Sequence, residues 1–364
     1  MTILIDCRLM VYRQAGITQY TRRLTRAMFS TGSASPILML DRRDEHTEWV
    51  PPDAMIVRTV TPAHHRFERF LLPFELRALS IRHPFTLLHS PDFITCVGTF
   101  KKVITIHDLY FLQNPNVLAK GVSSYYSRVA WSARKADHII AVSQFTKDDI
   151  VRILGVSKCA VTVVHEAADD MALPSPASQP EAIMNLIRST SPYAIFIGTI
   201  EPRKNLATLI QALGLAPMVQ VVIAGAAGWA ESGLQALAQE LGVSDRVTFL
   251  PQLDDYGRDL VLRHARCLVM PSLYEGFGLP PLEAMARGIP VICSNAGSLI
   301  EVVGQAALLH DPLDYQQLAT QLGNVWQDAA LRDKLTTLGL ARAALFSWNR
   351  AAVETSAIYS SLLN

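Results

Sequence analysis

Short apolar, β-branched runs alternate along the chain with longer segments in which apolar residues recur at helical spacing. Runs that are apolar on both faces are typical of strands buried on both sides of a sheet. Because helical segments separate the runs, they predict parallel sheets built from βαβ units. The predicted strands are residues 2–6, 101–108, 138–143, 161–166, 193–198, 219–225, 246–250, 267–272 and 290–295.

The alternation is interrupted once, at AADDMALPSPASQPEA, residues 167–182. Its Pro, Ser and Ala residues show little periodicity, which is typical of a linker and predicts a domain boundary near residue 172. A length of 364 residues also favours two domains. We therefore expect two doubly wound α/β domains, residues 1–172 and 173–347, with a cleft between them. Residues 348–364 are predicted to form a helix that packs back toward the N-terminal domain.

The composition narrows the function classes. Lys and Arg number 33 against 32 Asp and Glu, so the total charge gives no support to a nucleic-acid-binding role. Five scattered cysteines without a C-x-x-C pair favour a reducing compartment. The N-terminus lacks the pattern of a secretory signal, and no apolar run reaches the roughly 18 residues of a spanning helix. The expectation is a cytoplasmic globular enzyme.

Ligands of open parallel sheets bind beyond the carboxyl ends of the strands. After the predicted strand at 267–272 comes the loop Glu275-Gly276-Phe277-Gly278, and Pro280-Pro281 then begin a helix. Glu283 is expected in the first turn of that helix, where free amides favour an anion such as a diphosphate. Its carboxylate can accept two hydrogen bonds from a cis-diol such as ribose. For Glu283 alone, a helix-dipole or capping role is the alternative.

A second strand end carries two adjacent cations. In IFIGTIEPRKNLATLIQAL, residues 195–213, a strand runs into Gly198, and Arg203-Lys204 precede an amphipathic helix. Arg offers a planar fork and Lys a point charge, and together they can grip a diphosphate. The alternative is that both are solvated surface residues.

Two further strand ends lie in the N-terminal half. In VITIHDLYF, residues 103–111, His107-Asp108 follow an apolar strand, and a histidine there can orient a hydroxyl or shuttle a proton. A structural histidine is the alternative. In DCRLMVYRQAGITQYTRRL, residues 6–24, Gly16 can let the backbone approach a ligand closely, although an ordinary strand-to-helix turn also explains it.

The two glutamates Glu275 and Glu283 complete an E-x7-E motif. With it the chain resembles, over nearly its full length, the retaining nucleotide-sugar glycosyltransferases of family 4, or glycosyltransferase group 1. That resemblance implies the GT-B fold, in which two Rossmann-like domains face each other across a cleft. It also implies that residues 1–172 bind the acceptor and residues 173–347 bind the nucleotide sugar.

The resemblance assigns roles to the C-terminal residues. It implies that Glu283 holds the nucleotide ribose and that Glu275 lies near the donor sugar. Arg203 and Lys204 become the diphosphate clamp. The other residues that it implies for donor binding are Gly198, Gly276, Phe277, Gly278 and Leu279.

In the N-terminal half, the resemblance places His107 opposite the donor sugar and makes Asp108 a neighbour of the acceptor. Relatives carry a Gly-Gly-Ile loop near the donor phosphates, whereas here the pair is Ala15-Gly16, so only Gly16 is available for that approach. His165-Glu166 stand where many relatives have Asn-Gly, and the sequence gives no role for them.

The expected chemistry is metal-independent. The chain contains no D-x-D motif and no cluster with metal-ligand spacing, so neither a metal nor another cofactor is expected. Arg203, Lys204 and helix-terminal amides would neutralise the leaving diphosphate. The resemblance implies that the acceptor hydroxyl attacks from the face that the diphosphate leaves. Closure of the domains would exclude water.

The motif variants look most like bacterial mannosyltransferases of O-antigen or exopolysaccharide assembly. GDP-mannose is therefore the first expected donor, UDP-glucose or another UDP-sugar is the alternative, and a glycan or lipid-linked glycan is the expected acceptor. Rival functions are a sugar-nucleotide epimerase of the same fold, a pyridoxal-dependent glycan phosphorylase, and a nucleotide-sugar-binding module without catalysis.

One segment bears on a membrane partner. HHRFERFLLPFELRALSIRHPF, residues 64–85, mixes arginines with aromatic and aliphatic residues. Such a surface can rest on anionic lipid, which predicts peripheral contact at the inner face of the membrane. The alternative is an ordinary domain helix whose arginines face water.

Overall fold

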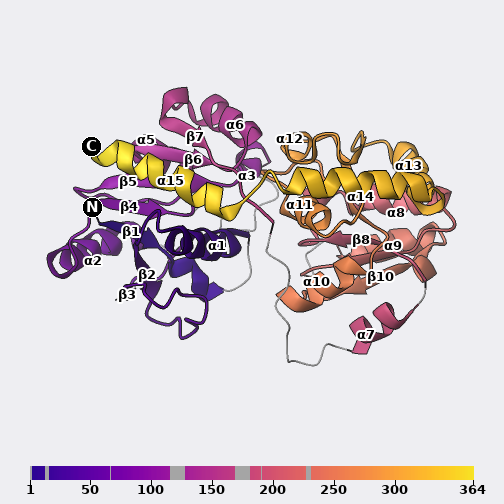
Figure 1. Ribbon diagram of the computed structural model, residues 1–364, viewed down its shortest axis with the longest axis horizontal. Coiled ribbons are helices and arrows are strands. Elements are labelled where there is room, and N and C mark those ends of the chain that lie inside the picture. The colour runs from indigo at the N-terminus through magenta and orange to yellow at the C-terminus, as the bar shows by residue number, and fades with distance from the viewer. Residues whose placement is uncertain are drawn as a thin grey trace. The chain divides into compact units, whose positions relative to one another are not determined.

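The computed structural model describes residues 2–12, 16–65, 67–114, 128–168, 181–189, 191–226 and 231–364. The chain forms two compact units (Figure 1). Unit 1 comprises residues 1–166 and 347–364, and unit 2 comprises residues 167–346. The predicted boundary near residue 172 falls among residues 169–180, outside the described residues.

The strands of unit 1 form one parallel sheet in the order β3-β2-β1-β4-β5-β6-β7. The strands are β1 (Ile3–Asp6), β2 (Ile37–Asp41), β3 (Ile56–Thr59), β4 (Leu87–Ser90), β5 (Lys101–Ile106), β6 (His138–Ala141) and β7 (Val161–Val163). The helical segments are η1 (Arg8–Tyr12), α1 (Gly16–Thr31), α2 (Glu68–Arg82), α3 (Tyr110–Gln113), α5 (Val129–Lys135), α6 (Gln144–Leu154), η3 (Lys158–Ala160) and α15 (Trp348–Leu363).

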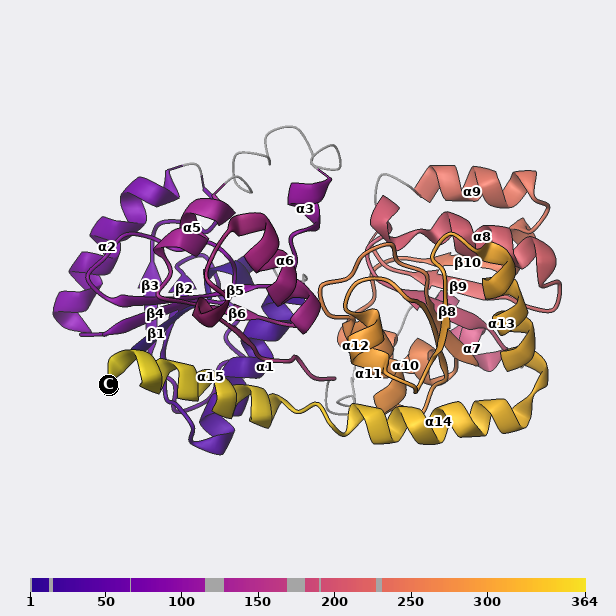
Figure 2. The same ribbon diagram turned by 90° about the horizontal axis from the view of Figure 1, so that it is seen from above.

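Helices cover both faces of this sheet, as the apolar strands predict. In β1, Ile3 and Ile5 pack into a core with α1 and α15, whereas Leu4 packs into the opposite core with α2. In β5, Ile104 and Ile106 pack against α5 and α6. Figure 2 shows α1 and α15 on one side of the sheet and α2 and α5 on the other. The period of two therefore sends side chains into a buried layer on each face.

Unit 2 contains a second parallel sheet, in the order β10-β9-β8-β11-β12-β13. Its strands are β8 (Ala194–Ile197), β9 (Val221–Ala224), β10 (Val247–Leu250), β11 (Cys267–Met270), β12 (Val291–Ser294) and β13 (Leu308–His310). Its helical segments are α7 (Glu181–Arg188), η4 (Pro202–Lys204), α8 (Leu206–Leu215), α9 (Glu231–Glu240), η5 (Ser244–Arg246), α10 (Asp255–Arg263), α11 (Leu279–Ala286), α12 (Leu299–Val303), α13 (Tyr315–Gln327) and α14 (Ala329–Ala343).

Each sheet has one point at which the direction of winding reverses. In unit 1 the chain runs outward from β1 through β2 to β3 and then restarts at β4, beside β1. In unit 2 it runs from β8 to β10 and restarts at β11, beside β8. The predicted class of two doubly wound Rossmann-like domains is confirmed; that they face each other across a cleft stays a prediction. Ligands of such folds bind at these reversal points. We therefore expect ligand-binding residues at the ends of β1, β4, β8 and β11.

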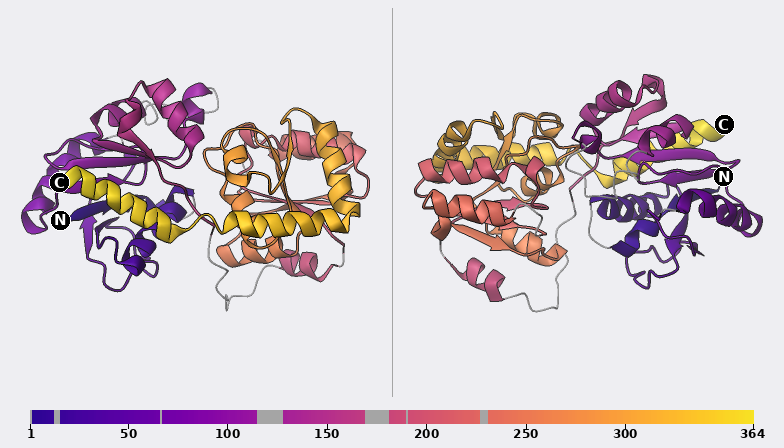
Figure 3. Two further views of the ribbon diagram at one scale, coloured as in Figure 1. Left: turned by 45° about the horizontal axis from the view of Figure 1, so that its top comes forward. Right: turned by 180° about the vertical axis from the view of Figure 1, so that it is seen from behind.

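The last helix, α15, returns to unit 1 and packs along α1 (Figure 3). Ala351, Ala352, Ile358 and Tyr359 are buried in the same core as the inward residues of β1. Among the helices described, none combines the length and apolar character required to cross a membrane.

Candidate functional site

The reversal point of unit 2 brings the predicted cations and a predicted carboxylate together. Arg203 and Lys204 lie in η4, which follows β8, and Glu275 lies in the loop after β11, the neighbouring strand. The backbone amide of Leu273 donates a hydrogen bond of 2.8 Å to the carbonyl oxygen of Arg203. This bond ties the two strand ends to each other, so the three side chains occupy one place.

Glu275 is the centre of a buried hydrogen-bonded cluster. Lys204 Nζ lies 2.7 Å from its Oε1, and Arg203 Nη1 lies 3.2 Å from its Oε2. The hydroxyl of Ser272 donates a bond of 2.6 Å to Oε1. Glu275 and Lys204 are only 6% and 7% exposed, so they form a buried ion pair rather than a surface contact. Lys204 is therefore not a solvated surface residue.

The charges of the cluster nearly balance. Burial alone would raise the pKa of Glu275, but Lys204 and then Arg203 outweigh burial and hold that pKa at about 2. Burial lowers the pKa of Lys204, and Glu275 opposes that effect. Glu201 Oε1 lies 2.6 Å from Arg203 Nε and supplies a second carboxylate. Lys204 keeps further N–H donors beyond the one that Glu275 accepts, because an ammonium has three.

The loop that carries Glu275 is fixed by residues at the start of α12. The Ser298 Oγ atom lies 2.9 Å from the carbonyl oxygen of Glu275 and 2.7 Å from that of Phe277, so the two carbonyls share its single hydroxyl hydrogen. A Cβ at Gly297 would lie 2.7 Å from the carbonyl oxygen of Glu275, and the φ of Gly297 is +60°. Only glycine fits this approach. Gly276 and Phe277 are buried within the same loop.

Glycines also shape the other side of the site. A Cβ at Gly225, after β9, would lie 1.9 Å from the carbonyl oxygen of Gly198, after β8. Gly278, at the N-cap of α11, has a φ of +111°, and a Cβ there would meet Leu299 at 2.8 Å. The strand ends therefore approach each other at distances that no side chain permits.

Glu283 lies one residue further into α11 than the sequence predicts, just beyond the first turn. The helix begins at Leu279 rather than at Pro280-Pro281, and Glu283 is its fifth residue, beyond the first turn. Its carboxylate is 2% exposed and receives both ends of the Arg258 guanidinium, each at 3.1 Å. Glu283 is therefore held by its ion pair with Arg258 rather than by the helix dipole. A carboxylate has further acceptor positions, so ribose hydroxyls and Arg258 can share it.

In unit 1, His107 lies directly after β5 and is fixed by neighbouring strand ends. Its Nδ1 lies 3.0 Å from Glu166 Oε1, and its Nε2 lies 3.0 Å from the carbonyl oxygen of Pro91. The hydroxyl of Thr146 donates to the His107 carbonyl at 3.3 Å. The ring of Tyr20 packs edge-on against the imidazole, with centroids 4.8 Å apart. Burial alone would lower the pKa of His107, but Glu166 outweighs it and the pKa is raised.

The two remaining N-terminal candidates have simpler surroundings. Asp108 Oδ1 accepts a 3.1 Å bond from the amide of Tyr110, so it stabilises the start of α3. Gly16 is the first residue of α1, and a Cβ there would meet nothing within 4 Å. The loop before Gly16, residues 13–15, lies outside the described residues.

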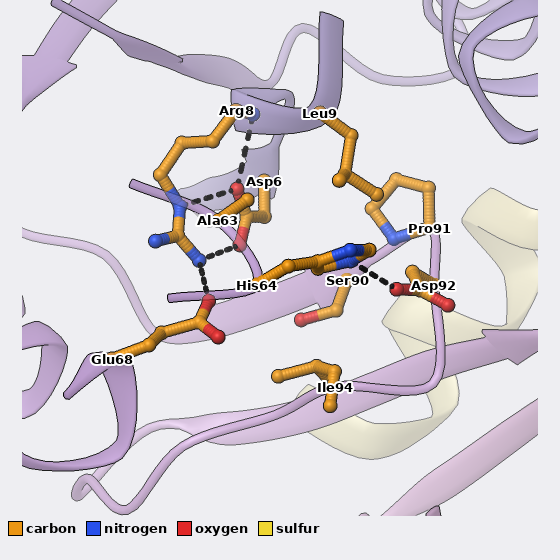
Figure 4. Close-up of a pocket in the computed structure, with 10 residues that line it drawn as sticks. All are labelled: Asp6, Arg8, Leu9, Ala63, His64, Glu68, Ser90, Pro91, Asp92 and Ile94. Carbon is orange, nitrogen blue, oxygen red and sulfur yellow. Dashed lines mark hydrogen bonds and ion pairs between the residues drawn. The ribbon is translucent and has the colours of Figure 1, made fainter. Parts of the chain in front are cut away.

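A small pocket opens at the reversal point of unit 1 (Figure 4). Its volume is about 10 Å³, which is the space that one water molecule needs. The lining residues come mainly from the ends of β1 and β4 and from the segment before α2: Asp6, Arg8, Leu9, Ala63, His64, Glu68, Ser90, Pro91, Asp92 and Ile94. Pro91 belongs to this pocket, and its own carbonyl oxygen contacts the Nε2 atom of His107.

Arg8 is a buried cation at the wall of this pocket, and carboxylates and a carbonyl oxygen surround its guanidinium. Its guanidinium contacts Asp6 through Nε at 2.8 Å and Nη2 at 2.6 Å, and Glu68 through Nη2 at 2.7 Å (Figure 4). Nη1 donates to the carbonyl of Thr61 at 3.0 Å. Arg128 approaches the other oxygen of Glu68 at 3.2 Å. The ion pairs hold the start of α2, and the bond to Thr61 holds the segment before it, against the end of β1.

Sequence reasoning missed the partners of the candidate residues. In the sequence, Glu166 stands out only as a departure from relatives, and no motif marks Arg258 or Ser272. Ser272, three residues before Glu275, could have been found from its position at the end of the predicted strand. The pairing of Arg258 with Glu283 joins two helices, and no local pattern encodes it.

Comparisons with known proteins point to one family. The family model "Glycosyltransferase Family 4" matches residues 15–170, and "Glycosyl transferases group 1" matches residues 180–339. O-antigen chain mannosyltransferase B of Escherichia coli is 33% identical over 283 residues, which is 76% of this chain and 74% of that protein. The serotype-specific mannosyltransferase WbdA of Escherichia coli is 28% identical over 70% of this chain, which spans only 32% of WbdA.

Solved structures share the fold. Sucrose-phosphate synthase from Thermosynechococcus elongatus superposes with a TM-score of 0.79 at 22% identity, covering 100% of this chain and 99% of that one. Anabaena HepE, solved with UDP and glucose, has a TM-score of 0.73 at 18% identity, covering 99% and 100% of the two chains. At these identities the likeness concerns the architecture.

Proposed function

The chain belongs to the family 4, group 1 glycosyltransferases, and on that premise we propose that it transfers mannose from GDP-mannose to a glycan or lipid-linked glycan. What carries the choice of mannose is the similarity to O-antigen chain mannosyltransferase B over three quarters of both chains. O-antigen assembly, or that of a related surface polysaccharide, is the setting in which we place the reaction.

In this proposal the donor binds at the reversal point of unit 2. Its diphosphate lies against Arg203 and the remaining N–H groups of Lys204, while Glu275 keeps both cations oriented before the donor arrives. Developing negative charge on the leaving diphosphate is then met by charges that need no rearrangement. Glu283, oriented by Arg258, accepts the ribose hydroxyls.

The transfer itself is proposed to retain the anomeric configuration and to need no divalent metal. The acceptor hydroxyl attacks from the face that the diphosphate leaves, and a diphosphate oxygen takes its proton. Arg203 and Lys204 supply the positive charge that a metal would otherwise provide. Gly198, Gly276, Phe277, Gly278 and Leu279 shape the donor pocket, Gly16 approaches the phosphates, and Asp108 lies beside the acceptor.

The experiment is a transfer assay with a donor panel. The purified chain is incubated with GDP-mannose, UDP-glucose or UDP-galactose and a lipid-linked glycan extract, in EDTA or in Mg²⁺. We expect acceptor-dependent GDP release in both media, and a product whose anomeric carbon keeps the donor configuration by NMR. A preference for a UDP-sugar would replace the donor, an inverted product would remove the retaining mechanism, and dependence on Mg²⁺ would remove the metal-free clamp.

We also propose that α2 rests on anionic lipid. The helix and the N-cap residue before it expose a group of large apolar residues, Phe67, Phe70, Leu71, Phe74 and Ile81. Arg69, Arg77 and Arg82 are exposed on the same helix. An amphipathic surface of this kind can bury its apolar residues at a headgroup boundary while arginines meet the phosphates. Arg66, part of the predicted segment, lies outside the described residues.

Sedimentation with phosphatidylglycerol vesicles tests this surface. We expect binding that weakens in salt and that Phe70→Ser with Phe74→Ser abolishes. A control, Met218→Ser with Leu313→Ser, removes apolar residues of unit 2 that are at least as exposed, and it should bind as the parent does. Equal loss in both double variants would show that α2 has no special role.

A further inference from the structure

Both ring nitrogens of His107 face oxygen acceptors. The carbonyl oxygen of Pro91 can only accept, so the Nε2 atom 3.0 Å away carries a proton. Nδ1 lies 3.0 Å from Glu166 Oε1. A carboxylate is also an acceptor, and the arrangement is satisfied on both sides when both nitrogens are protonated. The ring is then an imidazolium with no free nitrogen.

The two partners come from different strands and lie on opposite edges of the ring. Glu166 follows β7, Pro91 follows β4, and His107 itself follows β5, which lies between them in the sheet. The side chain of His107 is 19% exposed, whereas that of Glu166 is 5% exposed. The carboxylate is therefore the inner member of the pair, and the imidazole is the member that a ligand can reach.

The other titratable groups around His107 are compatible with a protonated ring. Asp92, two residues beyond β4, adds a negative charge that raises the pKa of His107. His89 in β4 is buried, and burial and then the charge of His107 lower its pKa to about 3, so it stays neutral. Tyr20 of α1 is buried, and burial raises the pKa of its phenol, which also stays neutral. Glu166, the carbonyl of Pro91 and Asp92 are the groups that raise the pKa of His107 against the effect of burial.

We propose that Glu166 is a positioning residue that holds His107 as a fixed imidazolium, with both N–H groups bound by the protein. Its positive charge serves an anionic ligand, and the side chain does not shuttle protons. This extends the proposed function, because a nucleotide diphosphate sugar is such a ligand. It also gives a role to the Glu166 position, which the sequence alone left without one.

An NMR titration of the full chain, labelled in its histidines, tests the charge directly. His107→Asn assigns the resonance. In the parent protein we expect His107 to titrate above the ordinary histidine range. Glu166→Gln keeps an acceptor for Nδ1 but removes the charge, and it should lower the titration midpoint by about one to three pH units. Glu166→Asp keeps the charge and should retain most of the elevation.

A matched control is Glu354→Gln in α15, which removes a partly exposed carboxylate from the same unit. It should leave the His107 midpoint unchanged. A midpoint that is the same in the parent and in Glu166→Gln would overturn the proposal, as would a neutral His107 in the parent at pH 7. Thermal melts of all variants confirm that each is folded when it is compared.

A second readout follows GDP affinity at pH 6 and pH 8.5. The parent should lose less affinity between the two pH values than Glu166→Gln, which should lose affinity several-fold at the higher pH and recover it at the lower. A structural defect would not recover on acidification. If the protein turns over no sugar and binds no nucleotide, the proposed function fails, while the NMR titration still decides the role of Glu166. If His107 loses its charge and GDP affinity does not respond, the ligand role is overturned.

Discussion

At the scale of residues, the buried pair of Lys204 and Glu275 joins the ends of two adjacent strands, so it stabilises unit 2 as well as belonging to the proposed diphosphate clamp. Lys204→Met should abolish most transfer and also destabilise unit 2 by about 3 to 5 kcal/mol, because it leaves the carboxylate in a buried site without its main partner. The double variant Lys204→Met with Glu275→Gln should recover stability without recovering transfer. Denaturant unfolding and the transfer assay, run on the same preparations, separate the two effects. Normal transfer by Lys204→Met would disprove the diphosphate clamp.

The low pKa of Glu275 has a consequence in acid. A carboxyl whose folded pKa, about 2, lies below its unfolded value of about 4.5 stabilises the fold above pH 4.5. That contribution is lost as the pH falls from about 4.5 toward 2. We expect the melting temperature of the parent to fall more steeply over this range than that of Glu275→Gln. Parallel melting curves from pH 6 to pH 3 would contradict the ion-pair account.

Arg258 offers a separate test of the proposed ribose site. Arg258→Met should leave the Glu283 carboxylate buried without its guanidinium partner and weaken nucleotide binding. Arg258→Lys keeps a charge but loses the two parallel bonds, so it should bind with intermediate affinity. Fluorescence titration with a nucleotide analogue orders the three proteins. Unchanged affinity in Arg258→Met would separate Glu283 from the nucleotide.

Sequence reasoning reached several residues at this scale but not their partners. Arg203, Lys204 and Glu275 stand beside predicted strand ends, and the carboxyl ends of neighbouring parallel strands meet by geometry. Glu166 and Arg258 find their partners through tertiary packing, since Glu166 is 59 residues from His107 and Arg258 is 25 from Glu283. Contacts between residues so far apart in the sequence depend on how the strands and helices pack, and the local sequence pattern does not contain that information.

At the scale of elements, each predicted strand run contains a strand, from β1 and β5 to β12. Four strands were not predicted: β2, β3, β4 and β13. Runs such as ILMLD in β2 and LLHS in β4 are rich in Leu, which also favours helices, and lack the β-branched signature. In β3, only alternate residues are buried, and β13 has three residues. These four strands are placed in the sheets by backbone hydrogen bonds to the adjacent strands.

The turns that bring these elements together make a prediction about glycine. Gly225→Ala should destabilise unit 2 by about 1 to 3 kcal/mol, because its Cβ would overlap the carbonyl oxygen of Gly198. Gly323→Ala is the matched control: Gly323 lies inside α13 with no atom near the new Cβ, so alanine should stabilise by about 0.5 to 1 kcal/mol. Urea unfolding measures both. Equal effects of the two substitutions would contradict the close approach.

At the scale of the whole molecule, the chain leaves unit 1 and returns to it through α15. Tyr359 Oη lies 2.6 Å from the buried Nδ1 of His89. Tyr359→Phe should cost unit 1 about 1 to 3 kcal/mol by leaving that nitrogen without a partner. Tyr315→Phe in unit 2 is the control. Hydrogen exchange resolved by peptide should show faster exchange in unit 1 alone, and acceleration in both units would contradict the assignment of α15.

The central claim for the whole molecule is a nucleotide-sugar site, built on Arg203, Lys204 and Glu275, that works without metal. Calorimetric titration of the parent and of Glu283→Ala with GDP, UDP and ADP, all in EDTA, tests it most directly. The account predicts GDP binding by the parent, weaker binding of UDP and ADP, and loss of GDP binding in Glu283→Ala with the fold intact. Absence of binding to every nucleotide, or GDP binding unchanged by Glu283→Ala, would contradict it.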